Sequence, residues 1–298
     1  MNVLVTGATG FVGPAVANAI VDAGHEVRVL ERKPGKWKEA GIRCQEAAQG
    51  DVTDLPSVRQ AVQGIDVVVH LVAIRQGKPE QFQRVMIDGT RNLIAAANEV
   101  GARRFVLMSA LGVTEETKDL VPYYNAKWTM EQDLKGSALE HVIFRPSFVF
   151  ARDGGILPTF LKMAKLSPFT AIMGSGEQRI QPIWIDDVGA YFAQSIDQPA
   201  AEKRTFEIGG PDVVTWNELW QRIRAALGIR RRPTVHMPIG LMRVPALVTE
   251  RLPGSIPLTR DLLTMLEAGD SVVSNDDAVE TFDVALVPLD EQLRRAAA

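Results

Sequence analysis

Short apolar runs alternate with longer amphipathic segments along the first half of this 298-residue chain. The runs are rich in β-branched residues and have the length of strands, whereas the segments between them carry apolar residues at helical spacing. Such alternation is typical of parallel strands joined by helical crossovers. We predict strands at residues 2–6, 26–32, 42–47, 66–73, 104–109 and 141–145.

The order of these elements predicts an α/β fold. The runs "VVVHLV" and "FVLM" are apolar without alternation, as expected for central parallel strands covered on both faces. The segment "PAVANAIVDAG" places Val16 and Ile20 on one helical face and ends at Gly24, a residue that commonly terminates helices. A longer segment, "EQFQRVMIDGTRNLIAAANEVG", ends in the same way at Gly101. We therefore predict a Rossmann-type, doubly wound parallel sheet.

After about Val149 the pattern changes to mixed helices, "GSG" and "GGP" turns and scattered prolines. We expect residues 1–150 to form the sheet domain, with residues 177–209 returning to it through the strand "RIQPIWI" and a helix from Asp186. A smaller mixed lobe would contain residues 151–176 and 210–298. The apolar stretch "VHMPIGLMRVPALVTERLPG" in that lobe is expected to pack internally, with a pocket lid or a docking face as the alternatives.

Three glycines, Gly7, Gly10 and Gly13, separate the first predicted strand from the first helix. This arrangement brings unpaired backbone N–H groups and the positive end of a helix dipole to one point, which suits a pyrophosphate. The first glycine makes the tight turn, the second lets the ligand approach the backbone, and the third allows close packing of helix and strand. Pro14 fits the first helical turn. The strand–turn–helix context predicts a dinucleotide site.

The glycine spacing, together with the leading Thr6 in "TGATGFVG", resembles the short-chain dehydrogenase/reductase superfamily, in its extended and atypical branches. The resemblance covers nearly the whole chain and includes "GDVTD", "HLVA", "FRPSFVF", "WIDDVG" and "FEIGGPDVVTWNEL". It implies an NAD(P)-binding domain and a set of cofactor-binding residues. These are Thr6, Gly7, Thr9, Gly10, Phe11, Val12, Gly13, Glu31, Arg32, Asp51, Val52, Leu71, Val72, Ala73, Ser109, Tyr123, Lys127, Pro146 and Phe148.

The end of the second strand bears on the choice between NAD(H) and NADP(H). An acidic residue there accepts hydrogen bonds from the ribose 2′-hydroxyl, whereas an arginine pairs with a 2′-phosphate. The segment "VRVLERKPGK" offers both, as Glu31 and Arg32, and Lys33 and Lys36 make its charge positive. We favour NADP(H), with Glu31 turned away or paired with a lysine. The alternative is that this segment is a solvated loop without a role in cofactor binding.

The motif "YYNAK" places Tyr123 and Lys127 one helical turn apart, on the same face of a predicted helix. A free tyrosine has a pKa of about 10, so proton transfer at neutral pH needs a nearby cation. The resemblance implies that Tyr123 exchanges the proton, that Lys127 lowers the pKa of Tyr123 and holds the cofactor ribose, and that Ser109 orients the substrate. Tyr124 is expected to pack in the core.

Two departures from the family pattern leave the catalytic prediction open. Ser109 is followed by Ala110 and Leu111 rather than further hydroxyl residues, so it could bind cofactor instead of substrate, and Met86 replaces a family asparagine in "VMIDGTRNL". These departures resemble the subgroup of the NADPH-binding accessory subunit of respiratory complex I. Two hypotheses follow: an NAD(P)-dependent oxidoreductase or epimerase-like enzyme, and a non-catalytic NADP(H)-binding accessory, assembly or redox-sensing protein.

The glycine turn and the family resemblance imply a dinucleotide, an unidentified small-molecule substrate and, for the second hypothesis, a protein as partners. The net charge of −3 argues against nucleic acid as a partner. Cys44 is the single cysteine, so no internal disulfide is expected, and the scattered histidines predict no metal site. The sequence shows neither a leader pattern nor an apolar run of membrane-spanning length. We expect a cytoplasmic location, or attachment to the membrane periphery through a partner.

Overall fold

The structure is a computed structural model that describes residues 1–230, 232–238, 240, 260–267 and 269–298. The chain divides into two compact units, and each is described here by itself. Unit 1 comprises Met1–Pro146, Ile185–Ile208 and Ser274–Ala285, and unit 2 comprises Ser147–Trp184, Gly209–Val273 and Leu286–Ala298. The predicted apolar lid or packing segment, residues 235–254, falls mostly outside the described residues.

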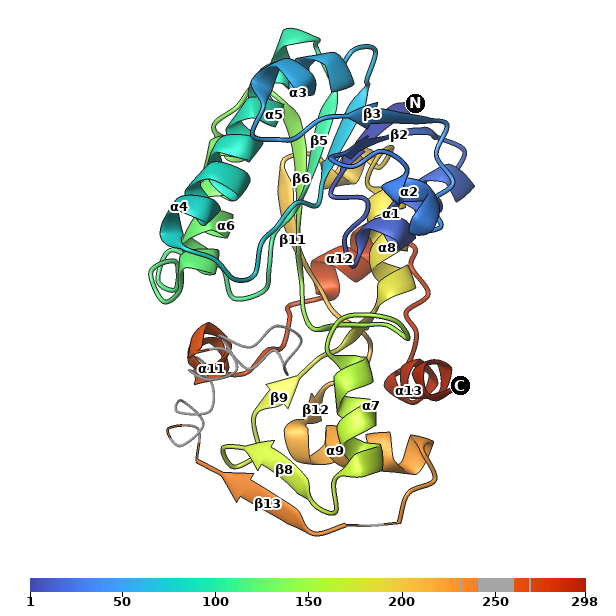
Figure 1. Cartoon of the computed structure of the whole chain (residues 1–298), viewed down its shortest axis with the longest axis vertical. Coiled ribbons are helices and arrows are strands. Elements are labelled where there is room, and N and C mark those ends of the chain that lie inside the picture. Colours follow the sequence, from blue (N-terminus) through green and yellow to red (C-terminus); the bar gives the residue numbers. More distant parts are fainter. Residues whose placement is uncertain (231, 239, 241–259, 268) are drawn as a thin grey trace. The chain divides into compact units, whose positions relative to one another are not determined.

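Unit 1 is built on a seven-stranded sheet in the order β11-β6-β5-β4-β1-β2-β3 (Figure 1). Every neighbouring pair in it is parallel, which confirms the predicted doubly wound α/β fold. The strands near its centre are buried throughout, as expected when helices cover both faces. The strands are β1 (Asn2–Thr6), β2 (Glu26–Glu31), β3 (Glu46–Gln49), β4 (Val67–His70), β5 (Arg104–Met108), β6 (Glu140–Pro146) and β11 (Arg204–Ile208).

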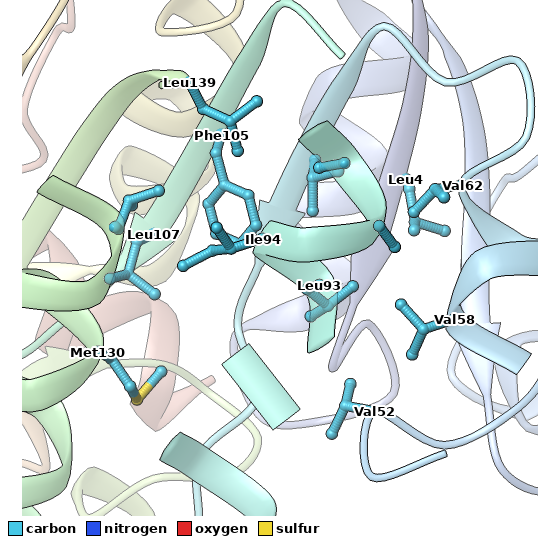
Figure 2. Packing of buried hydrophobic residues seen from close by; sticks show 14 of the residues in the cluster. Leu4, Val52, Val58, Val62, Leu93, Ile94, Phe105, Leu107, Met130 and Leu139 are labelled. Atoms are coloured by element: carbon cyan, nitrogen blue, oxygen red, sulfur yellow. The ribbon is translucent and has the colours of Figure 1, made fainter. Parts of the chain in front are cut away.

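A continuous apolar cluster packs the helices onto this sheet. In it, Leu4 and Phe105 from the strands meet Val58, Leu93 and Met130 from three different helices (Figure 2). All five side chains are fully buried, and burial of such side chains is the main favourable contribution to folding. The helices of unit 1 are α1 (Gly13–Asp22), α2 (Lys36–Glu39), α3 (Leu55–Ala61), α4 (Pro79–Gln81), the π-helix η1 (Phe82–Asp88), α5 (Gly89–Glu99), α6 (Pro122–Lys135), α8 (Ile185–Gln194), η2 (Pro199–Ala201) and α12 (Asp276–Thr281).

The return of the chain to unit 1 differs from the sequence-based division in two respects. It begins at Ile185 rather than at residue 177, because the short strands β9 (Arg179–Ile180) and β10 (Ile183–Trp184) pair within unit 2. A second return, Ser274–Ala285, places the ring of Phe282 5.6 Å from that of Phe144 on β6. The α8 helix packs closely on α1, since a Cβ added at Gly189 would lie 2.8 Å from the Ala15 carbonyl oxygen.

Three predicted elements differ in detail from the structure. The third strand covers Glu46–Gln49 rather than residues 42–47, in register with β2 through the Arg28–Glu46 pair. The long helix of residues 80–101 is interrupted by the π-helix η1. The strand "RIQPIWI" is split at Pro182, because proline has no N–H to donate to a strand ladder.

Unit 2 consists of small strand pairs and helices around aromatic side chains. β10 pairs with β7 (Val149–Phe150), β9 with β12 (Val214–Thr215), and β8 (Thr170–Met173) with β13 (Thr234–Met237). Its described helices are α7 (Leu157–Leu166), α9 (Trp216–Ala226), α11 (Arg260–Glu267) and α13 (Leu289–Ala297). In the part of the chain that the structure describes, no helix is both long and apolar enough to cross a membrane.

Candidate functional site

The glycine turn between β1 and α1 has no room for larger residues. Gly7 has a φ of +76°, and a Cβ there would lie 2.8 Å from the backbone nitrogen of Val72. A Cβ at Gly13 would lie 2.0 Å from the carbonyl oxygen of Ala8. Among the described residues, no side chain caps the N-terminus of α1 at Val12. The turn therefore leaves backbone donors and the positive helix end open to an anionic ligand.

A buried chain of hydrogen bonds lies directly behind this turn. The hydroxyl of Thr6 is 2.6 Å from Nδ1 of His70, and Nε2 of His70 is 3.0 Å from the hydroxyl of Thr90. Thr90 donates to the carbonyl oxygen of Met86 at 2.5 Å, so it must accept from His70. His70 then carries its proton on Nε2 and accepts from Thr6. Burial lowers the pKa of His70 to about 3, so the imidazole is neutral at physiological pH.

This network gives the side chain of Thr6, a predicted cofactor-binding residue, a partner within the protein. The Thr6 hydroxyl is fully buried and points to His70, although its backbone continues into the glycine turn. Sequence reasoning missed His70 and Thr90 as partners of Thr6, because no local spacing pattern connects residues so far apart along the chain. His70 lies 64 residues and Thr90 lies 84 residues after Thr6. The network also ties the end of β4 to the π-helix, where Met86 replaces the family asparagine.

We expect Thr90→Val to destabilise unit 1 by about 1–3 kcal/mol, because the buried Nε2–H of His70 loses its acceptor. Denaturant unfolding of the protein without cofactor measures this change. Thr129→Val is a matched control: Thr129 also bonds a carbonyl four residues earlier, that of Asn125, but this bond is exposed. Equal losses of stability in the two variants would contradict the proposed importance of the His70 bond.

At the end of β2, the carboxylate of Glu31 turns back into its own loop. Its two oxygens accept hydrogen bonds from the backbone N–H groups of Gly35, at 2.8 Å, and Trp37, at 3.1 Å. Glu31 is buried, whereas Arg32 and Lys33 are exposed. No described residue forms a hydrogen bond or ion pair with the Arg32 side chain. The Glu31 carboxylate is therefore occupied by its own loop, whereas the neighbouring guanidinium of Arg32 has no partner among the described residues.

The segments after β3 and β4 lie beside the same edge of the sheet. The N–H of Gly50 donates to the carbonyl of Glu31 at 3.0 Å, which brings "GDVTD" against the end of β2. Asp51 accepts from the N–H of Thr53 at 2.9 Å, and Val52 is buried under Gly89. After β4, Leu71 is buried, Val72 is half-buried and Ala73 is exposed.

Tyr123, Lys127 and Ser109 lie together at the carboxyl end of β5. Lys127 is 1% exposed, and its ammonium donates to the carbonyl oxygen of Met108 at 2.5 Å. The Lys127 Nζ lies 5.9 Å from the centre of the Tyr123 ring. Ser109 is buried, its N–H donates to Phe144, and its hydroxyl has no hydrogen-bond partner among the described residues. An unpaired buried hydroxyl is unfavourable unless a ligand or water satisfies it.

The electrostatics of this pair differ from what the resemblance implies. Burial raises the pKa of Tyr123 to about 12, and the cation that opposes this shift is Arg75 rather than Lys127. Burial also lowers the pKa of Lys127 to about 7, with Glu131 acting in the opposite direction. Tyr123 is thus a protonated phenol at neutral pH. It is suited to donating a proton, not to accepting one.

The predicted residues near the end of β6 fall in different units. Pro146 ends β6 in unit 1, where its carbonyl accepts the N–H of Leu111 at 3.1 Å. Phe148 belongs to unit 2, and its ring stands edge-on to Trp216, with 5.7 Å between centroids. The structure thus gathers the glycine turn, the strand ends and the Tyr–Lys–Ser group along one edge of the sheet in unit 1.

Comparison with known proteins shows the family to which the chain belongs. A family model described as NAD(P)H-binding matches residues 7–164. The chain is 27% identical over 331 residues to 2-alkyl-3-oxoalkanoate reductase of Stenotrophomonas maltophilia, covering 100% of this chain and 99% of that protein. It is 26% identical to NADH dehydrogenase [ubiquinone] 1 alpha subcomplex subunit 9 of Arabidopsis thaliana, and the match covers 95% of this chain and 73% of that protein. The match to divinyl chlorophyllide a 8-vinyl-reductase of that plant is 28% identical, covering 71% of this chain but only 54% of the relative.

Solved structures agree on the fold. The NADPH-dependent quinone oxidoreductase QOR2 of Escherichia coli, solved with NADPH, superposes with a TM-score of 0.78 at 18% identity, covering 98% of both chains. A UDP-glucose 4-epimerase from Thermotoga maritima and a short-chain dehydrogenase/reductase superfamily protein from Agrobacterium tumefaciens share the fold. The resemblance drawn from the sequence is therefore confirmed. The chain belongs to the NAD(P)H-binding family, with the fold of the short-chain dehydrogenases/reductases and epimerases.

Proposed function

We propose that the protein is an NADP(H)-dependent reductase that acts on a carbonyl group. The observation that carries this proposal is the convergence of Tyr123, Lys127 and the unpaired hydroxyl of Ser109 at the carboxyl end of β5. In open parallel sheets, ligands bind outside the carboxyl ends of the strands. A proton donor, a cation and a free hydroxyl at that position form a constellation suited to carbonyl chemistry.

Each residue has a separate part in the proposed mechanism. The nicotinamide cofactor, when bound, supplies the hydride. The glycine turn from Gly7 to Gly13 would hold the pyrophosphate of the cofactor, and Lys127 would bind a cofactor ribose. The Ser109 hydroxyl donates a hydrogen bond that orients the substrate carbonyl, and Tyr123 donates a proton to the same oxygen. Tyr123 is protonated at neutral pH, the form in which it can donate, although burial makes it a weaker acid than a free tyrosine by raising its pKa.

The similarity to 2-alkyl-3-oxoalkanoate reductase supports the reductive direction. The direct test is to purify the protein, identify the nucleotide that it carries, and follow NADPH oxidation with a panel of aldehydes, ketones and 3-oxo acids. Oxidation that depends on a panel carbonyl would support the proposal. A protein that binds neither NADPH nor NADH would contradict the proposal. A protein that binds NADPH but does not oxidise it with any carbonyl of the panel would also contradict it.

The preference for NADP(H) rests on the two side chains at the end of β2. A carboxylate near the adenine ribose would repel a 2′-phosphate, but both oxygens of Glu31 are held by the Gly35–Trp37 loop. The guanidinium of Arg32 is exposed and has no partner in the described part of the chain, so it is available to pair with the phosphate. We therefore propose Arg32 as the residue that selects NADP(H).

Arg32→Gln is expected to weaken NADPH binding about 10- to 100-fold, since a hydrogen bond to a charged group contributes about 1.5–3 kcal/mol. Affinity for NADH should be unchanged, because NADH has no phosphate at this position. Titration of both nucleotides by calorimetry measures the two effects. Lys33→Gln removes an adjacent exposed cation and serves as the control. If Arg32→Gln weakened NADH and NADPH binding equally, the assignment would be wrong.

A second candidate is a protein that binds NADP(H) without turnover. Two observations favour it: the Lys127 ammonium bonds Met108 instead of lowering the pKa of Tyr123, and one relative is a subunit of NADH dehydrogenase. In that case a protein partner, and a location at the membrane periphery through it, would replace the substrate. A tightly held NADPH that no panel carbonyl oxidises would support this candidate over the reductase.

A further inference from the structure

One face of α7 in unit 2 carries basic and aliphatic residues. Lys162, Lys165 and Leu166 on it are exposed, whereas Pro158 is half-buried and Leu161 is buried. Pro158, Leu161, Lys162, Lys165 and Leu166 follow the i, i+3, i+4, i+7, i+8 spacing that places residues along one side of a helix. A different side of α7 packs on α9 within unit 2 (Figure 1). There the centroid of the Phe160 ring lies 5.8 Å from that of Trp216 and 5.4 Å from that of Trp220.

This face borders a hollow of about 310 Å³. Its lining consists of Arg152, Pro158, Leu161, Lys162, Lys165, Leu166 and Ala296. The described lining thus contains three cationic side chains and no carboxylate side chain. None of the three cations forms an ion pair or hydrogen bond with a described residue. The hollow combines unneutralised positive charge with an aliphatic floor.

Two large apolar side chains stand out into solvent at the end of the same helix. Leu166 is 72% exposed, and Phe169, just beyond the end of α7, is 44% exposed. Arg232 donates to the carbonyl of Ala164 in the last turn of α7 and to that of Ser167 just beyond it, so a cation already lies at the negative end of the helix dipole. Leu166 borders the same hollow as Lys162 and Lys165, whereas Phe169 borders a separate, smaller hollow beside Trp220.

We propose that this face of α7 binds the anionic surface of a phospholipid bilayer. Lys162, Lys165 and Arg152 would contact lipid phosphates, and Leu166 would enter the boundary between headgroups and acyl chains. Charge complementarity selects this occupant, because the overall charge of the chain is −3 and only a local cluster attracts an anionic surface. Protruding apolar chains beside lysines are suited to insertion into a soft interface. The proposal does not depend on the proposed reductase activity.

Co-sedimentation of the full chain with vesicles tests this proposal. We expect the protein to bind phosphatidylcholine vesicles that contain phosphatidylglycerol, and to bind pure phosphatidylcholine vesicles much more weakly. The double variant Lys162→Gln/Lys165→Gln should lower the partition coefficient roughly thirtyfold, since each lysine near an anionic surface contributes about fivefold. Leu166→Gln should weaken the binding that persists at high salt. NADPH affinity of each variant verifies that the chain is folded.

Lys78→Gln/Lys203→Gln is the matched control, because it removes two exposed lysines from unit 1 and changes the net charge equally. The proposal predicts that this control binds anionic vesicles like the parent protein. Equal binding of the parent to both vesicle types would overturn the proposal, as would equal losses in the two double variants. Displacement from vesicles by inorganic phosphate at constant ionic strength would show a site for a free anion, and would overturn the bilayer assignment.

Discussion

Tyr123→Phe is expected to lower kcat for carbonyl reduction by about 10²–10⁴-fold, because the variant lacks the hydroxyl that donates the proton. NADPH affinity should remain unchanged, since the ring stays in place against the apolar cluster of unit 1. The measurement compares steady-state NADPH oxidation with a panel carbonyl and direct titration of NADPH. Loss of turnover without loss of binding is the pattern expected of a group that acts only in the chemical step.

The adjacent Tyr124 provides the matched control for this experiment. It lies on the same helix, its ring centre is 6.2 Å from that of Tyr123, and burial raises its pKa to about 12 as well. Tyr124→Phe removes the same atom from a more deeply buried ring, and it should leave kcat close to the parent value. If both variants lost turnover equally, the effect would be structural. If Tyr123→Phe kept full turnover, Tyr123 would not be the proton donor.

Lys127→Met is expected to abolish measurable turnover and at the same time to stabilise the cofactor-free protein by about 1–4 kcal/mol at pH 7. The reason for the stabilisation is that burial lowers the pKa of Lys127 from 10.5 to about 7, and each unit represents about 1.4 kcal/mol. Methionine has a similar length and no charge to bury. The lost hydrogen bond to Met108 offsets part of this gain.

The stability difference should depend on pH in a defined direction. Between about pH 7 and 10.5 the unfolded chain carries a proton on Lys127 that the folded chain has lost. The Lys127 contribution to the unfolding free energy of the parent therefore rises with pH through this window. The advantage of Lys127→Met should be largest below pH 7 and should shrink toward pH 10.5. Denaturant unfolding at a series of pH values measures it.

Lys135→Met is the control for the stability change. Lys135 lies on the same helix, two turns further on, but its side chain is 36% exposed and pairs with Glu131 at 3.4 Å. Its replacement should give no stabilisation, because no comparable desolvation is relieved. A similar gain in both variants would indicate that methionine simply favours the helix. A loss of stability in Lys127→Met would show that the Met108 bond outweighs the buried charge.

The sequence determined the fold and the presence of a dinucleotide site. Periodicity predicted the strands of the parallel sheet, because strands buried on both faces lack polar positions, and the structure confirms that architecture. The role of the glycines in the first turn could also be predicted from the sequence, because it depends on local backbone geometry. A left-handed φ at Gly7 and a 2.0 Å approach at Gly13 exclude any side chain.

Only the tertiary structure decided which partners the site residues take. The sequence placed Glu31 and Arg32 side by side but could not show that backbone N–H groups four and six residues later hold the Glu31 carboxylate. Likewise, Thr6, His70 and Thr90 form one network because the end of β4 and the start of α5 are packed behind the glycine turn. The pKa values of Tyr123 and Lys127 depend on burial, a property of the packed chain. Spacing along a helix fixes which residues share a face, whereas long-range packing fixes how deeply they are buried and what they contact.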